Sequence, residues 1–455
     1  MTENYTYLKY DKTGKAVVGC SRDAINVVIP DGITKIAEDA FAHCQSLTSV
    51  EISNSVKKIE EWAFHDCTSL VSIVIPNRVK KIEESTFEGC ISLNTIIIPN
   101  SITRIGENAF SGCSSLKSII IPDSVKRIDD GAFCDCKSLT SVEIPNSVTK
   151  IGDCVFDGCD SLTEIIFSED NEKYASIDGI IYNKADSPLI LRCIIKDGVV
   201  EIPNDVACIE WLSFKGTRIT SVVIPNSVKS IEYCAFADCQ FLSSVVIPNN
   251  LKEIGCRAFS GCHSLTSINI PNSVTNIEKE VFCDCNSLKE IIVADDNPNY
   301  RSIDGVLYTK DLTTLKCCPR TKKGVFNIPN SVTIIEDSAF NGCSSLTSIN
   351  IPDSVRHIGE YAFSECTSLT SIKLPNSITS IEKKTFDGCT ALKSVQIPDS
   401  VKSIGERAFR ECFALTSIKL PKTLQRIDDF AFRKCTSLTN LKIPDSVKNI
   451  GDCII

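Results

Sequence analysis

Apolar residues recur along this chain with a fixed period of 23 residues. The unit Cys136–Phe156, CKSLTSVEIPNSVTKIGDCVF, shows the pattern clearly. In it Leu139, Val142 and Ile144 are apolar, and the polar residues between them give the alternation of a strand with one buried face. Pro145 follows, and because proline cannot donate a hydrogen bond to a neighbouring strand, it ends the pairing. Each unit therefore predicts one strand.

A second apolar group in each unit predicts the opposite side of the same turn. Val148, Ile151 and Phe156 lack the spacing of a strand, so we expect turns and short irregular or helical segments there. Units repeated with a period in the low twenties stack into a solenoid that shares one continuous core. The sequence therefore predicts a solenoid with a single parallel β-sheet on one face, one strand per turn, and turns with short irregular or helical segments on the other.

A phenylalanine column and a cysteine column run through the units. The phenylalanines at this position are Phe41, Phe64, Phe87, Phe110, Phe133, Phe156, Phe214, Phe236, Phe259, Phe282, Phe340, Phe363, Phe386, Phe409 and Phe432. A cysteine stands three residues after almost every one of them, and free cysteine packs as a small apolar residue. We expect a core ladder of thiols. Stacked turns are also close enough for disulfides, so bridging between neighbours stays open.

The repeated string L-x-x-I-x-I-P-x-S-V-x-x-I-x-x-x-A-F-x-x-C resembles the BspA-like leucine-rich repeats. The resemblance extends over most of the chain and implies a leucine-rich repeat solenoid. It also implies a curved surface protein of microbes that attaches to host proteins or to other cells. Its specificity is high for the fold and low for the function, because solenoids of one family bind many different partners.

Two interruptions divide the array, since the proline spacing rises to 58 residues between Pro145 and Pro203 and between Pro271 and Pro329. Each interruption adds an insert that reads strand, turn, strand, which predicts a β-hairpin; a protruding binding loop is the alternative. The expected parts are an N-terminal hairpin-like cap at 1–29, repeats at 30–167, a hairpin insert at 168–202, repeats at 203–293, a second hairpin insert at 294–328, and repeats with an uncapped end at 329–455.

Composition and charge exclude several classes of protein. The chain carries a net charge of -9 and no basic stripe, so we expect no nucleic-acid binding. No apolar run is long enough to span a membrane, and no secretory signal is visible at the start. Two locations stay open: the cell surface or secretion, which the resemblance implies, and the cytoplasm. We also expect end-to-end association through the uncapped C-terminal turn.

Catalytic and metal-binding patterns are missing from the sequence. There is no C-x-x-C pair, and His43, His65, His263 and His357 fall at scattered turn positions. We therefore expect no metal, no cofactor and no cysteine–histidine pair. No phosphate-binding loop or nucleophile elbow occurs either, which argues against an enzyme.

Candidate binding residues stand in an outward column of the predicted strands. In the first ten strands this column is mostly Val or Ile, and in the last five it is polar with three lysines. The candidates are Val74, Ile97, Ile120, Ile166, Val223, Val246, Ile292, Lys373, Lys419 and Lys442. One interpretation is that β-branched residues suit strands and were copied with the repeat. The other is an apolar strip that docks a protein, with the lysines forming a separate patch for acidic partners.

The sequence thus predicts a non-catalytic module for protein–protein interaction. The leading hypothesis is a BspA-like adhesin or surface antigen that binds host or cell-surface proteins through the sheet face. The alternative is an intracellular leucine-rich repeat scaffold whose cysteines are reduced, as is usual for cytosolic proteins.

Overall fold

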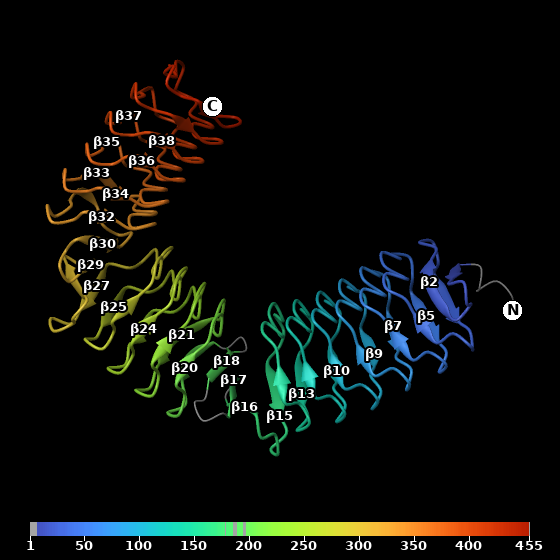
Figure 1. The fold of residues 1–455 in the computed structure, drawn as a ribbon. Helices are drawn as coiled ribbons and strands as arrows, with labels where there is room; N and C mark the ends of the chain where they lie inside the picture. The colour runs from blue at the N-terminus through green and yellow to red at the C-terminus, as the bar shows by residue number, and fades with distance from the viewer. Residues whose placement is uncertain (1–6, 178, 185–188, 194–196, 455) are drawn as a thin grey trace. The chain divides into compact units, whose positions relative to one another are not determined.

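The computed structural model describes residues 7–177, 179–184, 189–193 and 197–454. The chain divides into two compact units, Met1–Lys196 and Asp197–Ile455, and each is described by itself. Both are solenoids of stacked turns (Figure 1). Among the described residues there are strands and turns and no helix, and so none that could span a membrane.

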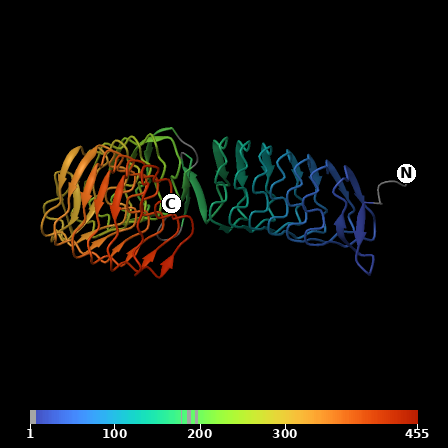
Figure 2. The same ribbon diagram turned by 90° about the horizontal axis from the view of Figure 1, so that it is seen from above.

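In the N-terminal unit the predicted strands form parallel ladders, and Figure 2 shows the successive coils stacked side by side. Partners in the ladders are one period apart, as in Ser72↔Thr95 and Val74↔Ile97. We call these strands the first ladder. In the N-terminal unit they are β3 (Asn26–Ile29), β5 (Ser49–Ile52), β7 (Ser72–Val74) and β9 (Thr95–Ile97), followed by β11 (Ser118–Ile120), β13 (Ser141–Ile144) and β15 (Glu164–Phe167).

The segment after each proline forms a second parallel ladder, where the sequence predicted irregular or short helical structure. Its strands have two residues each, and in most of them the isoleucine is buried while the residue before it is not. In the N-terminal unit they are β4 (Lys35–Ile36), β6 (Lys58–Ile59), β8 (Lys81–Ile82), β10 (Arg104–Ile105), β12 (Arg127–Ile128) and β14 (Lys150–Ile151). A two-residue strand has no alternation to detect, so sequence reasoning missed this ladder.

The C-terminal unit repeats both ladders. Its first-ladder strands are β19 (Gly198–Glu201), β21 (Ile219–Val223), β23 (Ser244–Val246), β25 (Ser267–Ile270), β27 (Glu290–Val293), β31 (Gly324–Asn327), β33 (Leu346–Asn350), β35 (Ser371–Lys373), β37 (Ser394–Gln396) and β39 (Ser417–Lys419). Its second-ladder strands are β20 (Cys208–Ile209), β22 (Ser230–Ile231), β24 (Glu253–Ile254), β26 (Asn276–Ile277), β32 (Ile334–Ile335), β34 (His357–Ile358), β36 (Ser380–Ile381), β38 (Ser403–Ile404), β40 (Arg426–Ile427) and β41 (Asn449–Ile450). The predicted solenoid is confirmed.

Within the described ranges, antiparallel strands occur at three places. At the N-terminus β1 (Leu8–Tyr10) pairs with β2 (Ala16–Cys20), and β2 pairs with the second ladder at β4. Each insert adds three antiparallel strands, one more than the two strands of the predicted hairpin. They are β16 (Tyr174–Ile177), β17 (Ile180–Asn183) and β18 (Leu189–Cys193) in the first insert, and β28 (Tyr300–Ile303), β29 (Val306–Thr309) and β30 (Thr314–Cys317) in the second.

A buried asparagine attaches each insert to the repeats. Asn171 Nδ2 donates to the carbonyls of Pro145 (3.1 Å) and Val148 (3.2 Å), while its Oδ1 accepts from the backbone of Lys173 and Tyr174. Asn297 makes the equivalent bonds in the C-terminal unit. One side chain thus satisfies four backbone groups at the start of each insert, and the two inserts share this asparagine.

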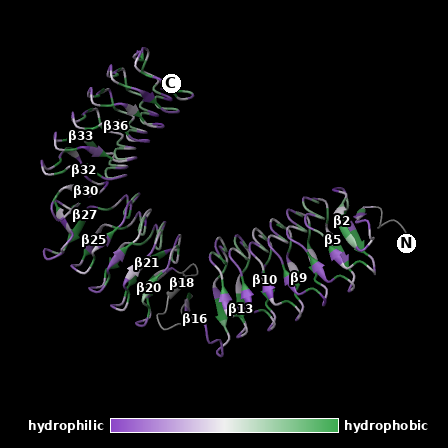
Figure 3. Ribbon diagram, in the orientation of Figure 1, coloured by the Kyte–Doolittle hydropathy of each residue, from purple (hydrophilic) through white to green (hydrophobic). Residues whose placement is uncertain are grey.

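The core is built from the phenylalanine and cysteine columns, and the hydropathy alternates around each coil (Figure 3). Phe110 is fully buried, and its ring stacks on Phe87 and Phe133 with centroids 5.5 and 5.4 Å away. The thiol of Cys113 donates to the carbonyl of Phe87 in the preceding turn at 3.2 Å. The same bond recurs along both units, and the cysteines whose side chains the structure describes, all except Cys193, are free thiols.

We expect Phe110→Ala to lower the free energy of unfolding by about 3–5 kcal/mol, because it leaves a cavity between two stacked rings. Since each turn contacts only its neighbours, hydrogen exchange should accelerate first in the adjacent turns. Phe413→Ala, which truncates an exposed phenylalanine outside the column, serves as the control and should change stability by less than about 0.5 kcal/mol. A uniform loss of protection over the whole chain would contradict this prediction.

The buried thiols should make stability fall at alkaline pH. Burial raises the pKa of Cys90, Cys239 and Cys285 to about 12, whereas an exposed thiol ionises near pH 8.5. Above that pH the unfolded chain releases protons that the folded chain keeps, so each such thiol lowers stability by about 1.4 kcal/mol per pH unit until pH ~12.

Urea unfolding at about pH 8 and about pH 10 measures this effect. The double variant Cys90→Ala, Cys239→Ala should show a shallower fall with pH than the wild type, whatever its stability at pH 8. Cys453→Ala, which removes an exposed thiol, should keep the wild-type dependence. Equal slopes for all three proteins would be incompatible with protonated core thiols.

Candidate functional site

The candidate aliphatic residues point away from the core on three successive strands. Ile73, Ile96 and Ile119 are buried, so the alternation of the strand turns the next residue outward. Val74, Ile97 and Ile120 are accordingly 55%, 56% and 85% exposed. Val74 lies directly opposite Ile97, and Ile120 follows one period later on β11. We call these three residues the aliphatic strip.

The aliphatic strip has polar surroundings. Exposed hydroxyl residues stand two positions before each member of the strip, at Ser72, Thr95 and Ser118. In the same outward column the strip is preceded by Glu51 and followed by Glu143, both exposed. This arrangement, an apolar centre with a polar border, is that of a small protein-binding patch.

The remaining aliphatic candidates are exposed but less continuous. Ile166 lies opposite Glu143, at the C-terminal side of the same column. In the C-terminal unit Val223 and Val246 face each other on β21 and β23, and Ile292 lies opposite Asn269. Ile166 therefore extends the column of the N-terminal unit, and the other three residues occupy the equivalent position in the C-terminal unit without forming a second strip of three.

The lysine candidates lie at the end of the C-terminal unit. Lys373 and Lys419 are exposed and lie on either side of Gln396 in the first ladder. Lys442 is exposed one period later, where no strand continues the ladder. Only the first two lysines therefore share a sheet.

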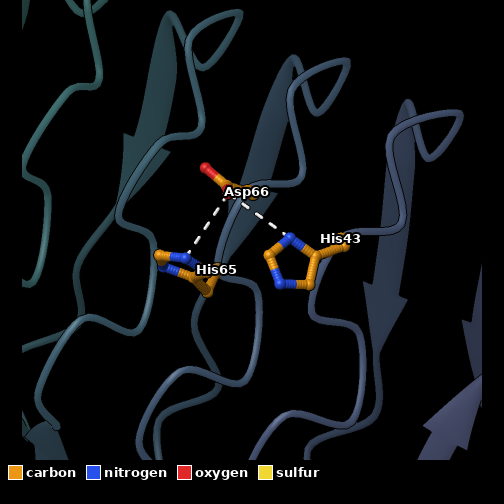
Figure 4. Close-up of side chains that lie close together, drawn as sticks. All are labelled: His43, His65 and Asp66. Carbon is orange, nitrogen blue, oxygen red and sulfur yellow. Dashed lines mark ion pairs between the residues drawn. The ribbon is translucent and has the colours of Figure 1, made fainter. Parts of the chain in front are cut away.

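Sequence reasoning missed a cluster of His43, His65 and Asp66 in the N-terminal unit (Figure 4). Nδ1 of His43 lies 3.3 Å from Oδ2 of Asp66, and Nε2 of His65 lies 3.4 Å from the same oxygen. The two rings are 5.3 Å apart at their centroids. The signal that could have found the cluster is the period itself, because positions 43 and 66 are one repeat apart and so lie on neighbouring turns.

Several solved structures of leucine-rich repeat proteins are similar to this chain. A leucine-rich repeat protein from Bacteroides ovatus is 28% identical, covers 98% of this chain and 97% of its own, and superposes with a TM-score of 0.45. A leucine-rich cell surface protein from Faecalibacterium prausnitzii is 27% identical over 98% of this chain and 92% of its own, with a TM-score of 0.39. The pneumococcal vaccine antigen PcpA is 20% identical over 98% and 92%, with a TM-score of 0.35. A comparison with curated proteins gives no match.

The family assignment rests on the repeats themselves. The family model described as "BspA type Leucine rich repeat region (6 copies)" matches residues 19–139, 80–183, 207–323, 315–418 and 402–455. These matches include both ladders and the phenylalanine and cysteine columns of both units. The chain therefore belongs to the BspA-type leucine-rich repeat family.

Proposed function

We propose that this chain is an adhesin or surface antigen that binds a host or cell-surface protein through the first-ladder face. Leucine-rich repeat solenoids are generally non-catalytic modules whose extended surfaces bind proteins. The observation that carries the proposal is the aliphatic strip, in which three β-branched side chains stand in solvent with no part in the core.

The free energy available at the strip favours a binding role. Covering a fully exposed isoleucine contributes on the order of 2 kcal/mol, and Ile120 is the most exposed large apolar residue described. The strands that carry the strip are already ordered by their ladders, so little backbone entropy is lost on binding. A few such residues at the centre of an interface supply much of its affinity.

The border of the strip offers a basis for selectivity. Glu51 and Glu143 would disfavour partners with acidic groups at the edge of the contact and favour basic ones. Lys373 and Lys419 would form a second contact of opposite charge, suited to acidic partners. The remaining column residues, Ile166, Val223, Val246, Ile292 and Lys442, would enlarge these contacts.

The alternative is an intracellular scaffold that uses the same face. The buried free thiols are compatible with a reducing compartment, where disulfides are rare. They do not require one, because burial and hydrogen bonding to phenylalanine carbonyls also protect a thiol from oxidants.

We expect the double variant Ile97→Asp, Ile120→Asp to lose capture of its partner without a change in the melting transition, since both side chains lie outside the core. Immobilised full chain would be exposed to solubilised surface proteins of host epithelial cells, and the retained proteins quantified by mass spectrometry. The control Ile91→Asp, Ile334→Asp adds the same charge at exposed isoleucines outside the first ladder and should retain the same proteins as the wild type. Equal retention by both double variants would exclude the strip as the binding surface.

A surface location predicts that a non-permeant protease applied to intact source cells removes this chain while cytosolic markers survive. The cleavage is followed through its tryptic peptides by mass spectrometry. As the control, the same protease should degrade the chain after the cells are lysed. Full protection of the chain in intact cells would then favour the intracellular scaffold.

A further inference from the structure

Two neighbouring turns of the N-terminal unit bring two imidazoles and one carboxylate to a common point on the surface (Figure 4). We propose that His43, His65 and Asp66 bind a divalent transition metal of the zinc type. The site lies on the turns between the second and first ladders, and so it is separate from the aliphatic strip on the strands.

Two of the three spacings between the ligand atoms match those of a tetrahedral metal site. Zinc is bound at about 2.0–2.1 Å by nitrogen and oxygen, which places the ligand atoms of a tetrahedral site about 3.3–3.4 Å from one another. Oδ2 of Asp66 lies 3.3 Å from Nδ1 of His43 and 3.4 Å from Nε2 of His65. All three atoms lie within 4.8 Å of one another, so small side-chain rotations would bring them around one ion.

The backbone holds these side chains on ordered turns. The amide of His43 donates to the carbonyl of His65, and the amide of Asp66 donates to the carbonyl of Glu88, each at 2.7 Å. His43 and Asp66 both have left-handed backbone conformations, with φ of 59° and 54°. In the next turn the same position is Gly89. A Cβ at this residue would collide with Oδ1 of Asp66, so the glycine leaves room for that carboxylate. The site therefore uses the regular turn geometry, and binding a metal requires no rearrangement of the chain.

His65 also has the outer partner that a metal-bound histidine usually has. While its Nε2 faces Asp66, its Nδ1 is buried, makes no hydrogen bond and lies 3.7 Å from Oε2 of Glu88. Metal-bound histidines generally donate their second ring N–H to a carboxylate, which fixes the tautomer. A small movement of Glu88 would make this bond, and it would satisfy the one buried ring nitrogen of the cluster.

The donor set determines the class of metal. Two imidazoles favour zinc and its transition-metal neighbours, whereas magnesium and calcium prefer all-oxygen sites. Thiols do not contribute, because the two column cysteines next to these residues, Cys44 and Cys67, are buried and donate to the carbonyls of Ser21 and Phe41. His43 and Asp66 are half exposed, so a fourth coordination position faces solvent and is open to water or to a side chain of another protein.

The chain's four histidines make the proposal directly testable by NMR on the full protein. With ¹⁵N labelling of histidine alone, ZnCl₂ should shift the ring signals of His43 and His65 and leave those of His263 and His357 unchanged. The pattern should show coordination through Nδ1 of His43 and Nε2 of His65. MgCl₂ and CaCl₂ should shift none of the four.

Variants assign the binding to these residues. His65→Ala and Asp66→Asn should each weaken zinc binding, measured by isothermal titration, by at least about tenfold, and Glu88→Gln by about tenfold. Asp135→Asn, at the same turn position three repeats later beside Cys134, and His357→Ala should bind as the wild type does. In the presence of a chelator Asp66→Asn and Asp135→Asn should melt at the wild-type temperature, because neither side chain is buried, so their loss of binding is read independently of the partly buried His65.

Several results would overturn the proposal. They are undiminished zinc binding by the double variant His43→Ala, His65→Ala, equal shifts of all four histidines, and a thiolate charge-transfer band in the Co²⁺ complex. Shifts of His43 and His65 that occur on acidification but not with ZnCl₂ would mean that the cluster is only a set of histidine–aspartate ion pairs.

Discussion

The hydrogen bond from a column cysteine to a phenylalanine carbonyl of the preceding turn joins successive turns of the solenoid through the core. Cys44 and Cys343, which each begin a run of repeats, bond to other carbonyls of the preceding turn. The phenylalanine carbonyl already accepts a backbone hydrogen bond within its own turn, as from Cys90 N to Phe87 O at 3.2 Å, and the thiol of Cys113 adds a second donor to the same oxygen from the next turn. Cysteine suits the position because it is small and apolar and still has a donor. Where Thr217 replaces it, the hydroxyl bonds to the carbonyl of Phe214 in its own turn, and the thiol of Cys239 bonds to the same oxygen from the next turn.

Much of the fold could be predicted from the sequence because one rule, the 23-residue period, generates it. Val142 and Phe156 identify the strand and the stacked core, and the structure places both in the core. The second ladder could not be predicted, because a pair such as Lys58–Ile59 is too short to show alternation. The first strand of each insert was also missed. Turn residues stand on both sides of Tyr174–Ile177, with Asp170-Asn171 before it and Asp178-Gly179 after it in the sequence, but four residues are too few to establish a strand by alternation.

Of the two candidate sites, one could be predicted from the sequence and the other could not. The outward direction of Ile97 and Ile120 follows from strand alternation, which is a local property, and the structure places both in solvent. The contact between His43 and Asp66 is not local. It depends on how the turns are stacked and on the side-chain conformations at two left-handed positions, and neither can be obtained from residue types alone. A search of the sequence for polar residues one period apart would have found the pair, but not its geometry.

The left-handed position that carries His43 and Asp66 has an evolutionary consequence. Every turn presents the same backbone there, whether it holds Gly89, Asp135 or a histidine, so its side chain can change without refolding. Any location on this surface is defined by two coordinates, the position within the turn and the repeat number. Recombination between repeats copies whole turns, and it therefore transfers a pair of interacting residues together with the backbone that aligns them. New surface chemistry in such a chain can arise by duplication of a turn, before any point mutation improves it.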